Sequence, residues 1–135
     1  MYILINLSTK DILKLSLFDD KKYNEKSYLG QNRELLICIE KILKTNKTTL
    51  KTLTGLIVVV GHGGFTSTRI AVVTANTLAY TLKIPVIAIN NPNPNFEELT
   101  ILIPKIKKQP IGCYISASYS GEANIGKKTC KAELN

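Results

Sequence analysis

A run of five apolar residues, Leu56-Ile57-Val58-Val59-Val60, limits the possible folds more than any other part of the sequence. It lies between glycines and is rich in β-branched residues, which favour strands. Because the run has no polar alternation, it is typical of a strand that is covered on both faces. It is also far shorter than the roughly 20 residues that span a bilayer, so we expect no membrane segment.

Three further strands are predicted before this run, at 1–7, 12–18 and 23–29. The second alternates apolar and polar residues, which is the period of a half-buried strand. The polar segments 8–11 and 19–22 are short enough to be hairpin turns. The third strand has the composition of an edge strand.

The rest of the chain alternates helices and strands. Apolar spacing predicts helices at 31–46 and 66–82, the second with Thr66 or Ser67 as N-cap. A short strand is expected at 85–89, and a third helix over 96–103, with Glu97 and Glu98 in its first turn and Pro104 ending or kinking it. A last strand is predicted at 111–119.

This order of elements predicts one mixed sheet of about five strands with helices packed on it, a ribonuclease-H-like α/β lobe. At 135 residues, with 44% hydrophobic and 21% charged residues, the chain has the size and composition of one globular domain. We expect residues 1–110 to form the lobe and residues 111–135 to add a strand and a polar tail.

The charge and the cysteines favour a cytoplasmic protein without a metal site. The net charge is +8, but the basic residues are sixteen lysines and only Arg33 and Arg69. Arginine is preferred for bidentate phosphate and base recognition, so direct nucleic-acid binding is a secondary interpretation. Cys38, Cys113 and Cys130 form no CxxC pair, which fits a reducing compartment and excludes a typical zinc site.

The predicted helix 66–82 is apolar on two sides. Ala71, Ala75 and Leu78 lie on one side, and no charged residue occurs between Arg69 and Lys83. A helix on the surface of a small domain normally carries charge on its outward side. Either intramolecular packing covers the second side, or the side is a protein–protein interface, which is the interpretation we favour. The interface hypothesis names Leu36, Ile39, Leu43, Arg69, Ile70, Val73, Thr74, Thr77, Tyr80 and Thr81.

The glycine-rich turn before this helix is a second candidate site. Backbone N–H groups at a helix start bind anions, so Gly61, Gly63, Gly64 and Thr66 could bind phosphate, together with Asn6, Ser8 and Thr9 of the first hairpin. The alternative is that the glycines only permit a tight turn. The chain has no GxxxxGK[ST] element, and His62, its only histidine, has no partner spaced for catalysis.

The segment Gly61-His62-Gly63-Gly64-Phe65-Thr66-Ser67-Thr68-Arg69-Ile70-Ala71-Val72 resembles the G-P-G-S-F-T-G-x-R-I-G motif of the TsaB (YeaZ) family. The following Ala/Thr-rich helix and Ile84-Pro85-Val86 also match the family, and 3–9 resembles its I-D-T-S-T beginning. Residues 119–125 resemble its C-terminal end. The resemblance covers about residues 1–90, and most of the family's second lobe has no counterpart.

The resemblance implies an actin/Hsp70/sugar-kinase-like fold and a non-catalytic role. It implies partnership with the TsaD enzyme in making threonylcarbamoyladenosine in tRNA, through a helical interface formed by the first two helices. A TsaE-like ATPase would be a further partner, tRNA would be contacted indirectly, and the isolated chain would form a homodimer. No cofactor is implied for the chain itself, and ATP with Mg²⁺ would enter only in the complex.

Several residues depart from the family pattern. Asn6 stands where the family has an acidic residue, and Val73 and Thr77 stand where it has Ala and Gly. His62, Gly64 and Ser67 replace the Pro, Ser and Gly of the motif. Two alternative functions therefore stay open, a nucleotide-binding enzyme that uses the glycine-rich turn and a small basic tRNA-binding module.

Overall fold

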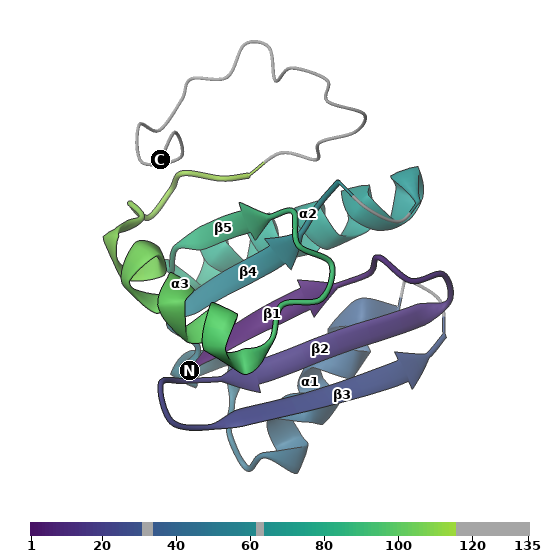
Figure 1. Cartoon of the computed structure of the whole chain (residues 1–135), viewed down its shortest axis with the longest axis horizontal. Coiled ribbons are helices and arrows are strands. Elements are labelled where there is room, and N and C mark those ends of the chain that lie inside the picture. The colour runs from purple at the N-terminus through teal and green to yellow at the C-terminus, as the bar shows by residue number, and fades with distance from the viewer. Residues whose placement is uncertain (31–33, 62–63, 116–135) are drawn as a thin grey trace, which may run out of the picture.

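The computed structural model describes residues 1–30, 34–61 and 64–115, with only the backbone at Phe65. The elements follow the predicted order (Figure 1). They are β1 (Tyr2–Asn6), β2 (Ile12–Phe18), β3 (Tyr23–Leu29), α1 (Leu35–Thr45), the 3-10 turn η2 (Leu50–Thr52), β4 (Gly55–Val59), α2 (Phe65–Leu82), β5 (Val86–Ile89) and α3 (Phe96–Lys108).

The five strands form one mixed sheet in the order β3-β2-β1-β4-β5. The β1–β2 and β2–β3 pairs are antiparallel, whereas β4 is parallel to both β1 and β5. The predicted mixed sheet of five strands is therefore confirmed, with β3 at its edge. Because β1, β4 and β5 run in the same direction, their carboxyl ends meet at one edge of the sheet, which we call the carboxyl edge, and their amino ends meet at the opposite edge.

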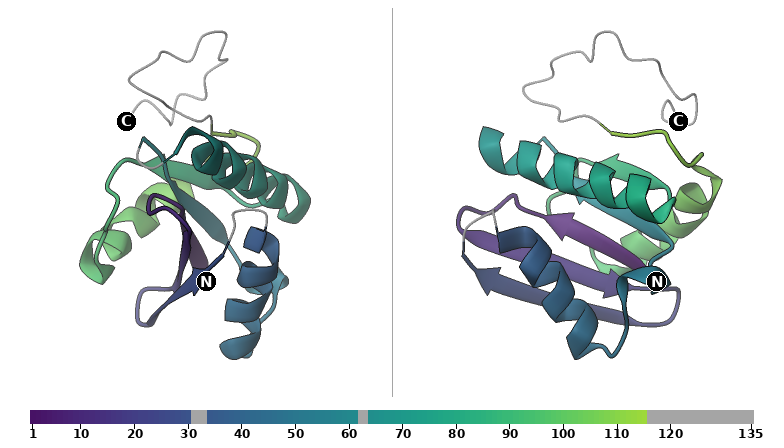
Figure 2. Two further views of the ribbon diagram at one scale, coloured as in Figure 1. Left: turned by 90° about the vertical axis from the view of Figure 1, so that its right-hand side faces the viewer. Right: turned by 180° about the vertical axis from the view of Figure 1, so that it is seen from behind.

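Helices cover both faces of this sheet. Figure 2 shows α1 and α2 side by side on one face and α3 on the other. Strand β4 is buried throughout, with Leu56 and Val58 in the core beneath α1 and α2 and Ile57 and Val59 in the core beneath α3. The apolar run thus forms a strand covered on both faces, as predicted.

Helix α2 begins earlier than predicted. Its N-cap is Gly64, not Thr66 or Ser67, and the Gly64 carbonyl accepts both the N–H and the hydroxyl of Thr68 at 3.0 Å. Extended backbone at Gly64 starts the helix without a side-chain cap, so Thr66 and Ser67 lie in its first turn. At the other end Lys83 adopts a left-handed conformation and its N–H bonds to Ala79, which ends the helix.

Helix α3 starts as predicted but does not stop at Pro104. Asn95 and Glu98 form a reciprocal capping box, in which each side chain accepts the other's backbone N–H at 2.8–2.9 Å. Proline removes only one backbone hydrogen bond of the helix. The burial of Ile106 beyond it offsets this loss, so the helix continues to Lys108. Ile106 packs so closely on β4 that a Cβ on Gly55 would lie 2.5 Å from it.

The last described residues differ from the prediction. Residues 111–115 form a turn and an irregular segment and contain no strand, so the described part of the predicted strand 111–119 is wrong. Residues 116–135, which include the expected polar tail, lie outside the described residues. Within the described ranges, no helix is both long and apolar enough to cross a membrane.

Candidate functional site

The outward side of α2 is an exposed surface without charge at its centre. Val73 is 63% and Tyr80 71% exposed, and Thr77 lies between them on the same stripe. The opposite side of the helix packs on the sheet through buried Ala71 and Ala75. The remaining predicted α2 residues lie around the stripe, with Arg69 and Thr81 exposed and Ile70 and Thr74 half-buried.

Helix α1 presents different residues from those predicted. Ile39 is fully buried and Leu43 is 2% exposed, because the main apolar stripe of α1 packs on the sheet. Both residues were expected at a partner surface, and the structure corrects this. The exposed apolar residues of α1 are Leu36, which was predicted, and Ile37, which was not, at 53% and 54% exposed.

A hollow of about 300 Å³ lies beside the exposed stripe, between α2 and the segment 111–115. Its lining includes Tyr80 and Tyr114. Asn76 ties this segment to the helix, because its amide donates to the Ile115 carbonyl at 2.8 Å and accepts the Ile115 N–H at 3.0 Å. Asn76 and Tyr114 were not among the predicted site residues. The only signal in the sequence was a single amide within 70–82, which otherwise contains aliphatic, threonine and tyrosine residues.

The proposed phosphate loops lie at the carboxyl edge, but Asn6 is already engaged. Its amide nitrogen donates to the Pro92 carbonyl at 2.7 Å, and its oxygen accepts the N–H and hydroxyl of Ser8 at 3.0 and 2.6 Å. Asn6 is 3% exposed. The side chain therefore joins the first hairpin to the loop after β5. Thr9 lies in the exposed hairpin turn, where its carbonyl accepts the Ile12 N–H.

The glycine-rich turn has a clear backbone role in its described part. Gly61 has φ +85, and a Cβ there would lie 2.9 Å from the Asn90 side-chain oxygen. The left-handed conformation therefore favours glycine, and a side chain at this position would also displace the Asn90 amide. Gly64 caps α2, and Thr66 is exposed in the first turn of that helix. His62 and Gly63 lie outside the described residues.

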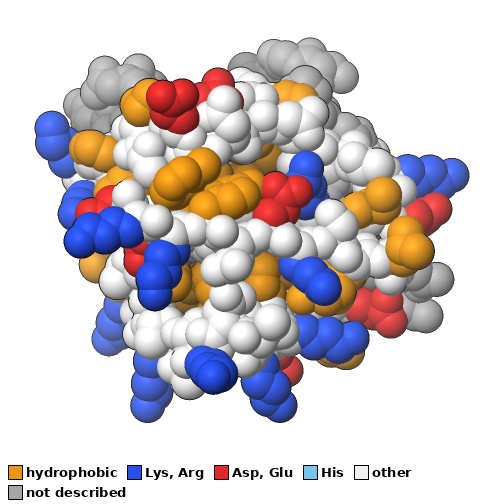
Figure 3. All heavy atoms as spheres, turned by 60° about the horizontal axis from the view of Figure 1, so that its bottom comes forward, with side chains coloured by type: hydrophobic (Ala, Val, Ile, Leu, Met, Phe, Trp, Pro, Cys, Tyr) orange, Lys and Arg blue, Asp and Glu red, His pale blue; other side chains and the backbone are white. Residues whose placement is uncertain are grey.

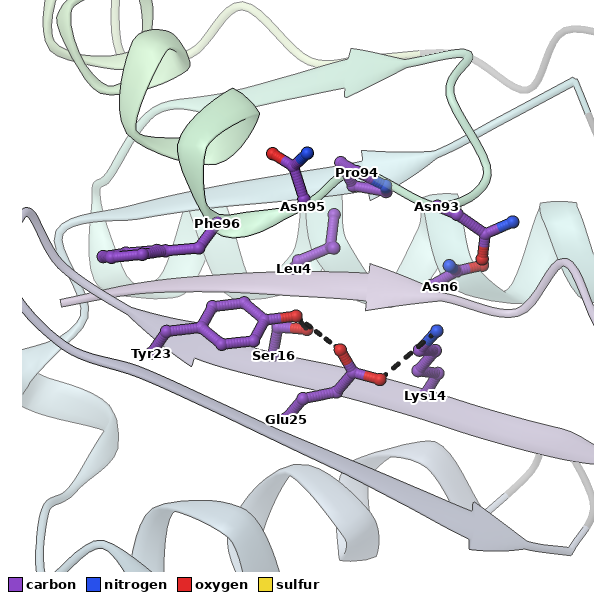
Figure 4. Close-up of a pocket in the computed structure, with 10 residues that line it drawn as sticks. All are labelled: Leu4, Asn6, Lys14, Ser16, Tyr23, Glu25, Asn93, Pro94, Asn95 and Phe96. Carbon is purple, nitrogen blue, oxygen red and sulfur yellow. Dashed lines mark hydrogen bonds and ion pairs between the residues drawn. The ribbon is translucent and has the colours of Figure 1, made fainter.

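A second hollow, of about 290 Å³, opens on the α3 face of the sheet (Figure 4). Tyr23 and Phe96 stand at one end with ring centroids 5.5 Å apart. Lys14 and Glu25 form an ion pair at 3.2 Å, and the Tyr23 hydroxyl donates to the Glu25 carboxylate. Burial, followed by this contact with Glu25, raises the pKa of Tyr23 above its ordinary value.

The two charged side chains of this hollow pair with each other. The Lys14–Glu25 pair cancels in charge, so the lining offers no net charge to a phosphate or carboxylate ligand. Among the described residues, no three His, Cys, Asp or Glu side chains are grouped to hold a metal ion. The exposed side of α2 is therefore the stronger candidate for a functional surface.

Solved structures with the same fold support this reading of the chain. YeaZ from Pseudomonas aeruginosa matches with a TM-score of 0.61 and 22% identity. A second structure, described as an uncharacterized protein with similarity to peptidase YEAZ from Pseudomonas aeruginosa, matches with the same values. In each case the match covers 67% of this chain, which spans only 43% of the YeaZ structures.

The sequence itself identifies the family. No curated protein matches the chain. Residues 30–121, more than half of it, match the family described as "TsaD: tRNA N6-adenosine threonylcarbamoyltransferase". The fold shared with YeaZ and this match confirm the resemblance to the TsaB (YeaZ) family and the expected ribonuclease-H-like lobe. The chain belongs to the TsaD family.

Proposed function

We propose that this chain is a non-catalytic partner of a TsaD-like protein in the formation of threonylcarbamoyladenosine in tRNA. The proposed contact is the exposed side of α2, extended by the exposed start of α1. The observation that supports it is the exposure of Val73 and Tyr80 on an 18-residue helix that has no charged residue between Arg69 and Lys83. A contiguous uncharged surface of this kind is typical of protein–protein interfaces.

The spacing of the exposed residues fits a partner helix. Val73, Thr77 and Tyr80 follow one another at intervals of four and three residues, which places them along one stripe of α2. Tyrosine is enriched in the energetically important part of interfaces. Packed helix axes lie about 8–10 Å apart, depending on the side chains between them. Because Val73 and Thr77 are larger than the Ala and Gly of the family, we expect the partner helix to lie farther from α2.

The non-catalytic part of the proposal is supported by Asn6. The resemblance places it where the family has an acidic residue, and its amide is occupied by Ser8 and Pro92. The chain therefore lacks a carboxylate at this position to orient a metal–nucleotide complex. We expect ATP, Mg²⁺ and a TsaE-like ATPase to act only in the assembled complex, and a homodimer to form through the same side of α2 when TsaD is absent.

The proposal is tested by measuring the affinity of the full chain for a TsaD-like protein by isothermal titration calorimetry. The variant Val73→Lys with Thr77→Lys places two charges in the contact. Loss of an important interface contact costs about 2 kcal/mol or more, so binding should weaken by about 30-fold or more.

The matched control is Ile101→Lys with Ile111→Lys, which adds the same charge at exposed apolar positions outside the contact, 70% and 59% exposed. This control should bind as the parent does, and circular dichroism should show that both variants are folded. Equal affinity of the α2 variant and the parent would refute the proposed contact.

A further inference from the structure

The amino edge of the sheet collects the ends of all three helices. Helices α1 and α2 run against the parallel strands, whereas α3 crosses the sheet from Phe96, beside Tyr23, to Ile106, beside Gly55 at the start of β4, so all three helices end near this edge (Figure 1). The β2–β3 turn lies at the same edge, because Phe18 pairs with Tyr2. The chain's N-terminal amine is also there, 3.4 Å from the Thr52 carbonyl.

Exposed lysines gather at this edge, and we call them the basic edge. They come from the β2–β3 turn, the end of α1, η2, the end of α2 and the end of α3. They are Lys21, Lys22, Lys44, Lys47, Lys51, Lys83, Lys105, Lys107 and Lys108. Figure 3 shows lysine and arginine side chains crowded along the left and lower margins of the molecule.

Few acidic groups offset this charge. In the part of the chain that the structure describes, the carboxylates near the basic edge are Asp19 and Asp20 of the β2–β3 turn and Glu40, which lines a hollow with Lys44 and Leu50, against nine lysines. Asp19 accepts the backbone N–H groups of Lys21 and Lys22, both at 2.7 Å. The lysines of the basic edge form no ion pair with a described residue. The ion pair found among the described residues joins Lys14 and Glu25, which lie on the α3 face of the sheet.

Two acidic residues lie near the carboxyl edge. Glu34 precedes α1 and Asp11 is in the β1–β2 hairpin, whereas Glu97 and Glu98 are in the first turn of α3, which begins beside Tyr23. The helix dipole favours lysines at the end of a helix. Lys44 lies in the last turn of α1, and Lys105, Lys107 and Lys108 lie in the last turn of α3, so these two helices place positive charge at the amino edge.

We propose that the basic edge binds the phosphate backbone of RNA. Lysines neutralise phosphates as point charges, and an edge without described arginines suits contact with the backbone more than with base edges. The choice of RNA over other polyanions rests on the proposed function in tRNA modification. The existence of the basic edge does not depend on the proposed function. A partner bound along Val73 and Thr77 would leave the ends of α1 and α3 accessible.

The test compares two charge-reversal variants of the full chain in binding an unmodified tRNA transcript over a range of salt concentrations. The edge variant is Lys51→Glu with Lys108→Glu. The matched control is Lys10→Glu with Lys26→Glu, two exposed lysines of the β1–β2 hairpin and β3 that lie outside the basic edge. Both variants carry the same net charge, so only the position of the change differs.

The parent chain should bind tRNA with a strong salt dependence. The edge variant should bind at least about tenfold more weakly, and its slope of log K against log salt should be shallower by about 1.4 to 1.8, since each of the two lost phosphate contacts contributes roughly 0.7 to 0.9. The control should stay close to the parent. Equal losses in the two variants, or binding to phosphatidylserine vesicles without binding to tRNA, would overturn the proposal.

Parallel measurements separate this proposal from the proposed function. The edge variant should keep the parent's melting temperature and its affinity for the TsaD-like protein. If the Val73→Lys, Thr77→Lys variant binds that protein as the parent does while the edge variant loses tRNA, the α2 contact is wrong and the basic edge stands. If the edge variant loses the protein partner and tRNA together, the assignment of the edge to RNA is wrong.

Discussion

Replacing Asn6 by alanine tests whether this side chain is a structural tie. The substitution removes three hydrogen bonds, one donated to Pro92 at 2.7 Å and two accepted from Ser8 at 3.0 and 2.6 Å. Each bond contributes about 0.5–1.5 kcal/mol net, and Asn6 is 3% exposed, so water does not readily replace them. We expect the free energy of unfolding to fall by about 2 to 4 kcal/mol, a large part of the about 5–15 kcal/mol of a typical domain.

The assay is urea unfolding followed by circular dichroism, with the free energy extrapolated linearly to water. Ser8→Ala is the matched variant, because it removes the hydroxyl contact with Asn6 and leaves the Ser8 N–H in place. It should cost about 0.5–1.5 kcal/mol. If Asn6→Ala costs less than about 0.5 kcal/mol, or no more than Ser8→Ala, the side chain is not the tie that the structure indicates.

Two further predictions concern the core and the β2–β3 turn. Ile39→Ala should lower the free energy of unfolding by about 2–5 kcal/mol because Ile39 is fully buried. The control Leu36→Ala, at a position 53% exposed, should cost well under about 1 kcal/mol. Similar costs of the two variants in urea unfolding would contradict the placement of Ile39 in the core. At Asp19, the backbone hydrogen bonds from Lys21 and Lys22 hold the carboxyl pKa below its ordinary value of 3.8. A depressed folded-state pKa contributes stability that is present above 3.8 and is lost as the pH falls through the lower folded value. Asp19→Asn should therefore flatten the acid limb of melting temperature against pH, and an unchanged limb would show that Asp19 does not contribute.

Much of the fold could be predicted because the local signals agree with one another. The unbroken apolar run in 56–60 predicts the strand covered on both faces that β4 forms. The alternation in Ile12–Phe18 predicts the strand β2 but not its burial, because Ser16 and Phe18 are covered as well as the leucines between them and β2 is not half-buried. Boundaries failed where tertiary packing outweighed a local rule. Helix α3 passes Pro104 because Ile106 is buried beyond it, and α2 starts at Phe65 because extended Gly64 serves as its cap.

The candidate interface was predicted only in part, for a physical reason. Helical periodicity separates the two sides of α2 and correctly exposes Val73 and Tyr80. It cannot tell how many turns of α1 the sheet covers, so it placed Ile39 on a partner surface although the sheet buries it. The contact of Asn76 with Ile115 joins residues 39 apart, and no local pattern in the sequence indicates such a pair.

Site-specific photo-crosslinking tests the central claim, that the exposed side of α2 contacts a protein partner, most directly. A benzophenone amino acid replaces Thr77 in the full chain, and the matched probe replaces Ile101, which is 70% exposed on α3. Irradiation with the TsaD-like protein should yield a covalent complex from position 77 and none from position 101. Crosslinking from 101 alone, or equal yields from both positions, would contradict the account.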